Sequence, residues 1–365
     1  MLVLLSGRSF AQPDPTELVF VGSGHKNIYA FRLNLTSGEL RAIGKAAGVA
    51  SPSFLATTPN QKYLYAITEG TTKGNSFVSA FRIDSESGKL ALLNREPSGG
   101  AGPCYLAADA KGKNVLVANY ISGSVSVFPI DGHGALGPMS AFVQDHGSSV
   151  DHYRQEGPHA HSVLTDPDGR FAFACDLGLD KVMIFKFDPA KGSLEANDPP
   201  SASIKPGSGP RHIAFHPNRR FAYVISEMAC TLTAFAYDPD RGVLTETGDY
   251  PLLSKDFKGQ SWAAEVAIHP SGRFVYASNR GDDSISVFGC DPATGRLTFI
   301  ERVSTEGKTP RNFDIDPSGA FLLAANQDSG TIIVFRIDPK SGHLEPIGGK
   351  ITADKPMCVK CMMTK

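Results

Sequence analysis

The sequence lacks long apolar runs and any surplus of charge of one sign. No apolar stretch approaches the ~18 residues that a membrane-spanning helix needs. The net charge is −1, and the lysines and arginines are not clustered along the 365 residues. These absences argue against a membrane-spanning protein, and against nucleic acid or an anionic membrane surface as the main partner.

Cysteine is also scarce, and the six cysteines form no complete zinc motif. Cys358 and Cys361 make a C-x-x-C pair, but a second pair is missing. Residues three apart in a strand point to opposite faces, so this pair is a poor redox or metal site. Most of the cysteines fall in predicted strands, where we expect them to be buried as small apolar side chains.

The first residues lack the features of a complete signal peptide. The segment 1–17 has no basic start, and its apolar run, Leu2–Leu5, is shorter than a normal signal-peptide core. The step around Ala11 nevertheless resembles a cleavage site. We interpret residues 1–17 as a leader or the remnant of a signal peptide. A truncated signal peptide would favour a periplasmic or secreted protein, and otherwise the protein would be cytoplasmic.

A sequence repeat made of short apolar runs and turns occurs seven times along the chain. Its clearest copies are 209–244, 262–297 and 309–344, and each contains a D-P-x-x-G-type turn followed by Leu. Short alternating strands with a fixed period of roughly 50 residues are typical of β-propeller blades. The repeats extend from about residue 18 to the C-terminus, so 18–365 is predicted to be a single all-β domain.

The two ends of the chain carry complementary parts of one blade. Residues 18–40 contain the later strands of a blade without a clear inner strand, whereas 355–363 is an inner strand with nothing after it. We therefore predict a seven-bladed β-propeller whose C-terminal strand joins the N-terminal blade. Because such closure removes the open sheet edge, we expect a monomer or a weak homo-oligomer.

Polar residues gather where the inner strands begin and the second strands end, which antiparallel connections place at one mouth of the ring. Four of them break the repeat, namely His161, Arg211, Glu227 and Arg280. A histidine beside a carboxylate can transfer a proton, and arginines bind carboxylate or phosphate. Buried charge costs several kcal/mol unless it is paired. The four residues are therefore either a catalytic site or a structural ion-pair network.

Further residues near this mouth are candidates for binding an anionic substrate. They are His159, Arg154, Arg311 and Asn119. Arg311 could instead be a solvated channel residue, and Asn119 recurs at equivalent positions of other blades, which favours a turn-capping role. His159 and His161 form an H-x-H pattern that could suggest a metal, but the nearby arginines would repel a cation. We expect no metal and no cofactor.

Several segments resemble the seven-bladed β-propeller lactonase family, which includes bacterial 6-phosphogluconolactonase and fungal 3-carboxy-cis,cis-muconate lactonizing enzyme. The similar motifs are residues 117–128, 146–188, 209–217 and 278–288. In the muconate branch a histidine, two arginines and a glutamate form the site. By motif these correspond to His161, Arg211, Glu227 and Arg280. The resemblance also implies a metal-free site, unlike that of calcium-dependent gluconolactonase propellers.

Three functions remain open. The first is a lactonase acting on a sugar lactone, most simply 6-phosphogluconolactone. His161 or Glu227 would activate water, while Arg211 and Arg280 would hold the substrate anion and stabilise the oxyanion. No Ser or Cys lies in a recognisable nucleophile elbow, which favours direct attack by water.

The second function is a cycloisomerase, a carboxymuconate cyclase that uses the same site. The third is a non-catalytic propeller that serves as a binding scaffold. The similarity to the bacterial branch favours the lactonase, with a small anionic lactone as its partner.

Overall fold

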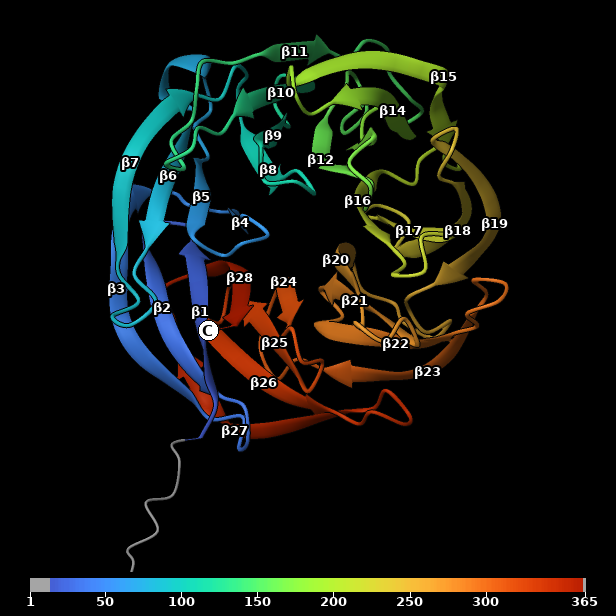
Figure 1. Cartoon of the computed structure of the whole chain (residues 1–365). Helices are drawn as coiled ribbons and strands as arrows, with labels where there is room; N and C mark the ends of the chain where they lie inside the picture. Colours follow the sequence, from blue (N-terminus) through green and yellow to red (C-terminus); the bar gives the residue numbers. More distant parts are fainter. Residues whose placement is uncertain (1–13, 364–365) are drawn as a thin grey trace, which may run out of the picture.

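The computed structural model describes residues 14–363 as seven four-stranded antiparallel sheets around a central axis (Figure 1). The innermost strands are β28 (Pro356–Met363), β4 (Leu55–Thr57), β8 (Pro103–Ala108), β12 (Ala160–Thr165), β16 (Pro210–Phe215), β20 (Trp262–Ile268) and β24 (Pro310–Ile315). The second strands are β1 (Thr16–Ser23), β5 (Tyr63–Thr68), β9 (Asn114–Asn119), β13 (Phe171–Asp176), β17 (Phe221–Ser226), β21 (Phe274–Arg280) and β25 (Phe321–Asn326). The prediction of an all-β seven-bladed propeller is confirmed.

The two remaining layers complete each blade. The third strands are β2 (Lys26–Asn34), β6 (Phe77–Ile83), β10 (Ser124–Pro129), β14 (Lys181–Asp188), β18 (Thr231–Asp238), β22 (Ser284–Cys290) and β26 (Thr331–Ile337). The outer strands are β3 (Leu40–Ala50), β7 (Leu90–Pro97), β11 (Ala141–Gln144), β15 (Ser193–Ser203), β19 (Val243–Pro251), β23 (Leu297–Ser304) and β27 (Leu344–Thr352). A single 3-10 turn, η1 (Lys73–Asn75), precedes β6.

The ring is closed as the sequence predicts. β1 pairs with β2 on one side and with the C-terminal β28 on the other, and Val19 lies opposite Cys361. Blade 1 therefore consists of β28-β1-β2-β3, and blades 2 to 7 follow in chain order. Most of the predicted leader, residues 1–13, lies outside the described residues. No helix among residues 14–363 is long and apolar enough to cross a membrane.

The core consists of apolar clusters, one between each pair of neighbouring blades. All six cysteines are unpaired and buried, which confirms that prediction. Cys358 packs between blades 1 and 2, and Cys361 packs between blades 7 and 1, so the C-x-x-C pair does point to opposite faces.

The D-P-x-x-G turns lock neighbouring blades together. Gly295 has a φ of +70°, and a Cβ atom there would lie 2.4 Å from the ring of Phe221 in the preceding blade, which explains why the repeat retains glycine. The carbonyl of Gly295 accepts a hydrogen bond of 2.8 Å from the hydroxyl of Tyr223. Tyr276 makes the same contact with Gly342 in the next pair of blades.

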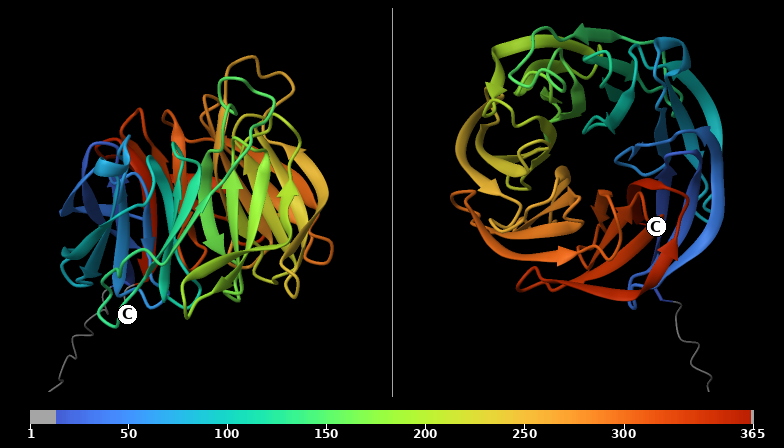
Figure 2. Two further views of the ribbon diagram at one scale, coloured as in Figure 1. Left: turned by 90° about the horizontal axis from the view of Figure 1, so that it is seen from above. Right: turned by 180° about the vertical axis from the view of Figure 1, so that it is seen from behind.

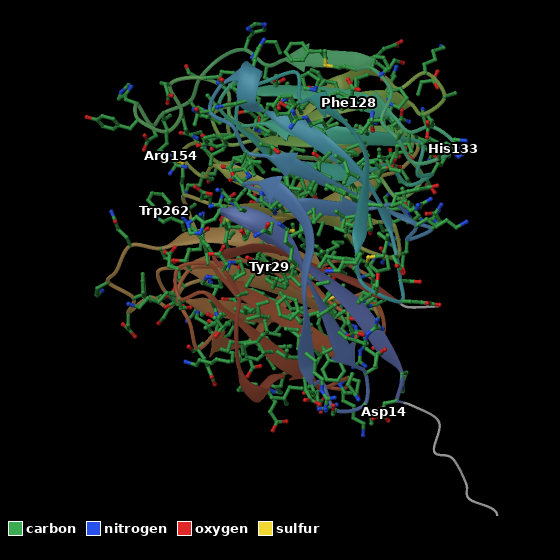
Figure 3. All side chains as sticks on the ribbon, turned by 90° about the vertical axis from the view of Figure 1, so that its left-hand side faces the viewer. Asp14, Tyr29, Phe128, His133, Arg154 and Trp262 are labelled. Carbon is green, nitrogen blue, oxygen red and sulfur yellow. The ribbon has the colours of Figure 1, made fainter. Side chains whose placement is uncertain are left out.

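The two faces of the disc differ. Inner strands begin and second strands end at one face, which we call the site mouth. Figure 3 shows Arg154 and Trp262 on this face and His133 on the opposite one. The long connection between β11 and β12 carries Arg154, and loops project beyond the blades on that side in the edge-on view of Figure 2. The site mouth is therefore the end of the channel that carries the long connection and the projecting loops.

Candidate active site

Each site-bearing inner strand contains an extra residue at its start. In β8, β12, β16 and β24 the pairing with the second strand skips one residue. The skipped residues are Cys104, His161, Arg211 and Arg311. A bulged residue is released from the ladder and its side chain is re-aimed. This local irregularity directs a thiol, an imidazole and two guanidinium groups towards the channel.

A cavity of about 360 Å³ opens at the site mouth. Five predicted site residues line it, and they are His161, Glu227, Arg280, Arg154 and Arg311. Glu69, Cys104, Tyr120 and Trp262 complete its polar and aromatic walls. Five of the eight predicted site residues therefore surround one cavity at this mouth.

Glu227 is the junction of the site. It follows β17 and is buried, with its backbone N–H donating to the carbonyl of Gly209 at 2.7 Å. Its Oε1 accepts a hydrogen bond of 2.7 Å from Nη2 of Arg154. Its Oε2 accepts bonds from Nε of Arg211 at 3.0 Å and from Nη2 of Arg280 at 2.7 Å. One carboxylate thus joins side chains from blades 5 and 6 to the long connection.

These contacts decide the charge of Glu227. Burial alone would raise the pKa of its carboxyl, but the guanidinium groups of Arg280 and Arg211 outweigh burial and hold this pKa well below its usual range. Glu227 therefore stays ionised, and both of its oxygens are occupied by strong donors.

His161 has the opposite character. Its Nε2 lies 3.8 Å from Oε2 of Glu227, and its Nδ1 lies 3.7 Å from Sγ of Cys104. Burial and the nearby charge of Arg211 lower the pKa of the imidazole well below its ordinary value, so the ring is neutral at pH 7. The contact with Cys104 is a hydrogen bond of ordinary length for sulfur, whereas the contact with Glu227 is longer than a nitrogen–oxygen hydrogen bond. Nε2 of His161 is therefore available to water or a ligand in the cavity.

Arg211 lies beneath the cavity and does not line its wall. Its side chain is only 3% exposed. Besides Glu227, it donates from Nη1 to the carbonyl of Ala264 at 2.6 Å and contacts Nε2 of His212 at 3.2 Å. The expectation that Arg211 itself holds the substrate anion therefore does not fit this geometry. Its guanidinium instead contacts Glu227, Ala264 and His212.

Two other predicted residues do not reach the cavity. His159 precedes the bulge, stacks on the ring of Tyr120 at 4.6 Å and contacts the Tyr120 carbonyl through Nδ1. Asn119 is fully buried, and its amide donates to the carbonyl of Ser98 and to Ser126. Asn119 therefore fits the alternative role of capping a turn. His159 packs against Tyr120 and does not face the cavity.

Arg154 reaches the site from far along the connection between blades 3 and 4. A turn places it there, because Oδ1 of Asp151 accepts the backbone N–H of Arg154 at 2.9 Å. Its guanidinium lies 5.3 Å from the ring of Trp262 and donates to the hydroxyl of Tyr120 at 3.2 Å. Trp262 and Tyr120 were missed by sequence reasoning. The only available signal was the position of the single tryptophan at the start of an inner strand.

Positive charge dominates the site. Four arginines, at positions 154, 211, 280 and 311, face two carboxylates, Glu69 and Glu227. Within residues 14–363, the side chain of Arg311 makes no hydrogen bond or ion pair with another residue. No group of three or more His, Cys, Asp or Glu residues with metal-binding geometry occurs in the described part of the chain. The residues present suit an anion better than a cation.

Comparisons with known proteins agree with this architecture. A family model described as a seven-bladed β-propeller lactonase matches residues 18–361. The 6-phosphogluconolactonase of Bacillus subtilis is 38% identical over 298 residues, which are 81% of this chain and 83% of that protein. The 6-phosphogluconolactonase of Formosa agariphila is 37% identical over 293 residues, 79% of this chain and 82% of that protein.

A solved structure gives the same result in three dimensions. The periplasmic gluconolactonase of Pseudomonas aeruginosa superposes with a TM-score of 0.89 at 32% identity and covers 95% of this chain and 99% of that one. The match of the family model over nearly the whole chain is the deciding observation. The chain therefore belongs to the seven-bladed β-propeller lactonase family.

Proposed function

We propose that this protein hydrolyses 6-phosphogluconolactone in the cavity at the site mouth. Membership of the family makes it a lactone hydrolase, and relatives with 37–38% identity carry the name of the phosphorylated-sugar enzyme. The observation that carries the proposal is a neutral histidine in a cavity whose Arg311 has no partner among the described residues. Such a cavity offers a base for water and a cation for a phosphate.

His161 is the general base in this proposal, and Glu227 is not. The oxygens of Glu227 accept hydrogen bonds from three guanidinium groups, so this carboxylate has little remaining affinity for a proton. The imidazole of His161 is neutral and faces the cavity. It removes a proton from water as the water oxygen attacks the lactone carbonyl carbon. Glu227, 3.8 Å away, then stabilises the imidazolium.

Arg280 stabilises the oxyanion of the tetrahedral intermediate. Its guanidinium is held by Glu227 and by the carbonyls of Trp262 and Ala263, at 3.2 Å and 3.1 Å for the carbonyls. A donor fixed before the reaction needs no reorganisation when charge develops on the carbonyl oxygen. The intermediate collapses by breaking the ring C–O bond, and the imidazolium returns its proton to the departing ring oxygen. The product is the open hydroxy acid.

Arg311 binds the phosphate, with Arg154 as a second cation at the rim. Guanidinium groups form paired hydrogen bonds with phosphate oxygens. Arg311 makes no competing ion pair in residues 14–363, whereas Arg154 is already bound to Glu227. Arg311 is therefore the residue whose removal should separate phosphorylated from unphosphorylated lactones.

The test is a hydrolysis assay with fresh 6-phosphogluconolactone and with gluconolactone, corrected for spontaneous opening. We expect His161→Ala to lower kcat for both substrates by ~10²–10⁴-fold, the usual contribution of a general base. Arg311→Ala should raise KM for the phosphorylated substrate alone. Wild-type rates no higher than spontaneous hydrolysis, or full activity of His161→Ala, would overturn the proposal. Turnover of a carboxylated muconate instead would support the cycloisomerase.

A further inference from the structure

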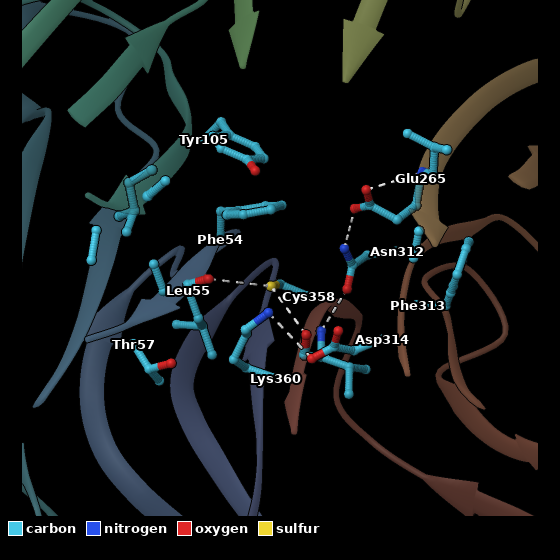
Figure 4. A pocket seen from close by; sticks show the side chains of 17 residues that line it. Phe54, Leu55, Thr57, Tyr105, Glu265, Asn312, Phe313, Asp314, Cys358 and Lys360 are labelled. Atoms are coloured by element: carbon cyan, nitrogen blue, oxygen red, sulfur yellow. Dashed lines mark hydrogen bonds and ion pairs between the residues drawn. The ribbon is translucent and has the colours of Figure 1, made fainter. Parts of the chain in front are cut away.

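A second, deeper cavity of about 280 Å³ lies in the channel below the candidate active site (Figure 4). Figure 4 shows Phe54 and Tyr105 on one side of it and Glu265 with Asn312 on the other. Tyr105 and Asn312 come one position after the bulged residues Cys104 and Arg311, so they belong to the next layer of the channel. His212 belongs to the same layer and is fully enclosed.

His212 contacts aromatic rings that line both cavities. Its ring centroid lies 4.9 Å from that of Tyr105 and 5.8 Å from that of Phe54, and both contacts are edge-on. The ring of His161 lies 5.4 Å away on the side of the active site. His212 is therefore a buried titratable group in contact with the site, and the proposed mechanism gives it no role.

The hydrogen bonds of His212 determine its tautomer. A guanidinium donates hydrogen bonds and cannot accept them. The 3.2 Å contact between Nη1 of Arg211 and Nε2 of His212 therefore makes Nε2 the acceptor. The proton of the neutral ring lies on Nδ1, which is 2.9 Å from Oε1 of Glu265. Arg211 therefore donates a hydrogen bond to His212, and His212 donates one to Glu265.

The other neighbours of His212 agree with a neutral ring. The charged and titratable groups that act on it are Arg211, Glu265, His161, Tyr105 and, through its charge, Arg311. Burial lowers the pKa of His212, and this effect exceeds the opposing influence of Glu265. A protonated ring would direct an N–H group at the guanidinium of Arg211 and would remove the acceptor that Arg211 uses.

Glu265 is itself held from the next blade. Its Oε2 accepts a hydrogen bond from Nδ2 of Asn312, and its Oε1 also accepts the backbone N–H of Val266 at 3.1 Å. The carbonyl oxygen of the Asn312 side chain accepts the backbone N–H of Val359 on β28 at 2.8 Å. The chain of hydrogen bonds therefore extends from the active site through blades 5, 6 and 7 to the strand that closes the ring.

We propose that His212 and Glu265 are positioning residues that fix Arg211, and through Arg211 the carboxylate of Glu227. The inference rests on the proposed function, because it assigns Glu227 and His161 to the reacting site. The guanidinium orientation that places Nη1 of Arg211 against His212 and the carbonyl of Ala264 also directs Nε to Glu227. Without the acceptor on His212, Arg211 and Glu227 lose part of the restraint that places them beside His161.

The first experiment reads the tautomer and needs no substrate. Nitrogen-15 NMR of histidine-labelled protein at pH 7 should show His212 protonated on Nδ1. His216 is a matched internal control with the opposite expectation, because its Nδ1 accepts the backbone N–H of Asn218 and its Nε2 donates to the carbonyl of Gly272. Resonances are assigned with the variants His212→Gln and His216→Gln. An imidazolium, or an Nε2-protonated ring at His212, would overturn the inference.

The second experiment exchanges the two ends of one hydrogen bond. Glu265→Gln places an amide N–H₂ against that of Asn312, and Asn312→Asp places a second carboxylate against Glu265. The double variant Glu265→Gln, Asn312→Asp restores every hydrogen bond, since the glutamine amide then donates to the aspartate. Only the position of the negative charge has changed, from residue 265, which contacts His212, to residue 312. The swap therefore separates the effect of the broken hydrogen bond from the effect of the charge lost beside His212.

We expect Glu265→Gln to lower kcat on the order of 10²-fold with little change in KM, as misplaced catalytic groups do. The double variant should regain the melting temperature of the wild type and most of kcat, and the pH dependence of kcat should return with it. Wild-type kcat in a folded Glu265→Gln variant would overturn the inference. If the wild type itself does not accelerate lactone opening, the proposed function fails, while the NMR result still decides the network around His212.

Discussion

Replacing Glu227 by glutamine removes the one anion that three guanidinium groups share. The variant keeps the shape of the side chain but presents an N–H₂ group where the carboxylate accepts hydrogen bonds from Arg154, Arg211 and Arg280. Two of these arginines are nearly enclosed, with exposed fractions of 3% and 12% for Arg211 and Arg280. They would remain buried without a counter-charge, which is the costly way to break an ion pair.

The expected loss of stability is about 3–5 kcal/mol, the usual cost of removing one partner of a buried pair. Unfolding entropy is roughly 2.1 cal/mol/K per residue, so a 365-residue ring that unfolds cooperatively should melt about 4–7 °C lower. The loss should also depend on pH. Since the folded pKa of Glu227 lies below its ordinary value, its contribution is full at pH 7 and disappears as the pH falls through that lowered pKa.

Thermal unfolding followed by circular dichroism at pH 7 and pH 3 measures both quantities. Glu69→Gln is the matched control, because Glu69 lines the same cavity but makes no side-chain ion pair within residues 14–363. We expect this control to melt close to the wild type at both pH values. A Glu227→Gln variant as stable as the control at pH 7, or a deficit that grows in acid, would refute the reasoning.

Three further outcomes follow from the same structure. Trp262 is the only tryptophan and lines the cavity, so intrinsic fluorescence should change saturably with the reaction product 6-phosphogluconate, and Trp262→Phe should abolish the signal. Burial raises the pKa of the Cys104 thiol, which keeps it neutral, so intact-mass measurement during turnover should show no acyl adduct on the protein. Burial and the neighbouring Asp176 raise the pKa of Asp145 to about 8, so the contribution of this carboxyl to stability should fall as the pH rises from about 4 to 8. The uncharged Asp145→Asn should flatten that fall in melting temperature measured across this range.

The blades were predictable because their pattern is local and repeated. Each inner strand was located from its apolar run and the turn that follows, and the closure by β28 followed from an inner strand missing at one end and left over at the other. Glu227 and Arg280 could be placed because they end second strands, whose position at the site mouth is fixed by the antiparallel connections. Their depth in the channel follows from strand direction alone.

The roles of Arg211 and His159 could not be read in the same way. Both stand close to the start of an inner strand, but a bulge decides which side chain enters the cavity, and its effect depends on neighbouring blades. Arg211 is held beneath the wall by the carbonyl of Ala264 in blade 6 and by the adjacent His212, which itself contacts Glu265 of blade 6. Periodicity does not encode such contacts. Arg154 lies in a non-repeated loop, where the repeat gives no guide to the position of a side chain.

The arrangement of the arginines explains why this site suits an anion. Arg211 and Arg280 are held by Glu227 and by backbone carbonyls, so their charge is fixed by the fold and cannot move away from the cavity. Arg311 brings a further positive charge and has no compensating partner in the described residues. Confined like charges repel one another, and the repulsion is stronger where water is excluded. In the function proposed above, an anionic lactone that enters the cavity relieves this repulsion, so the electrostatics of the site favour its binding.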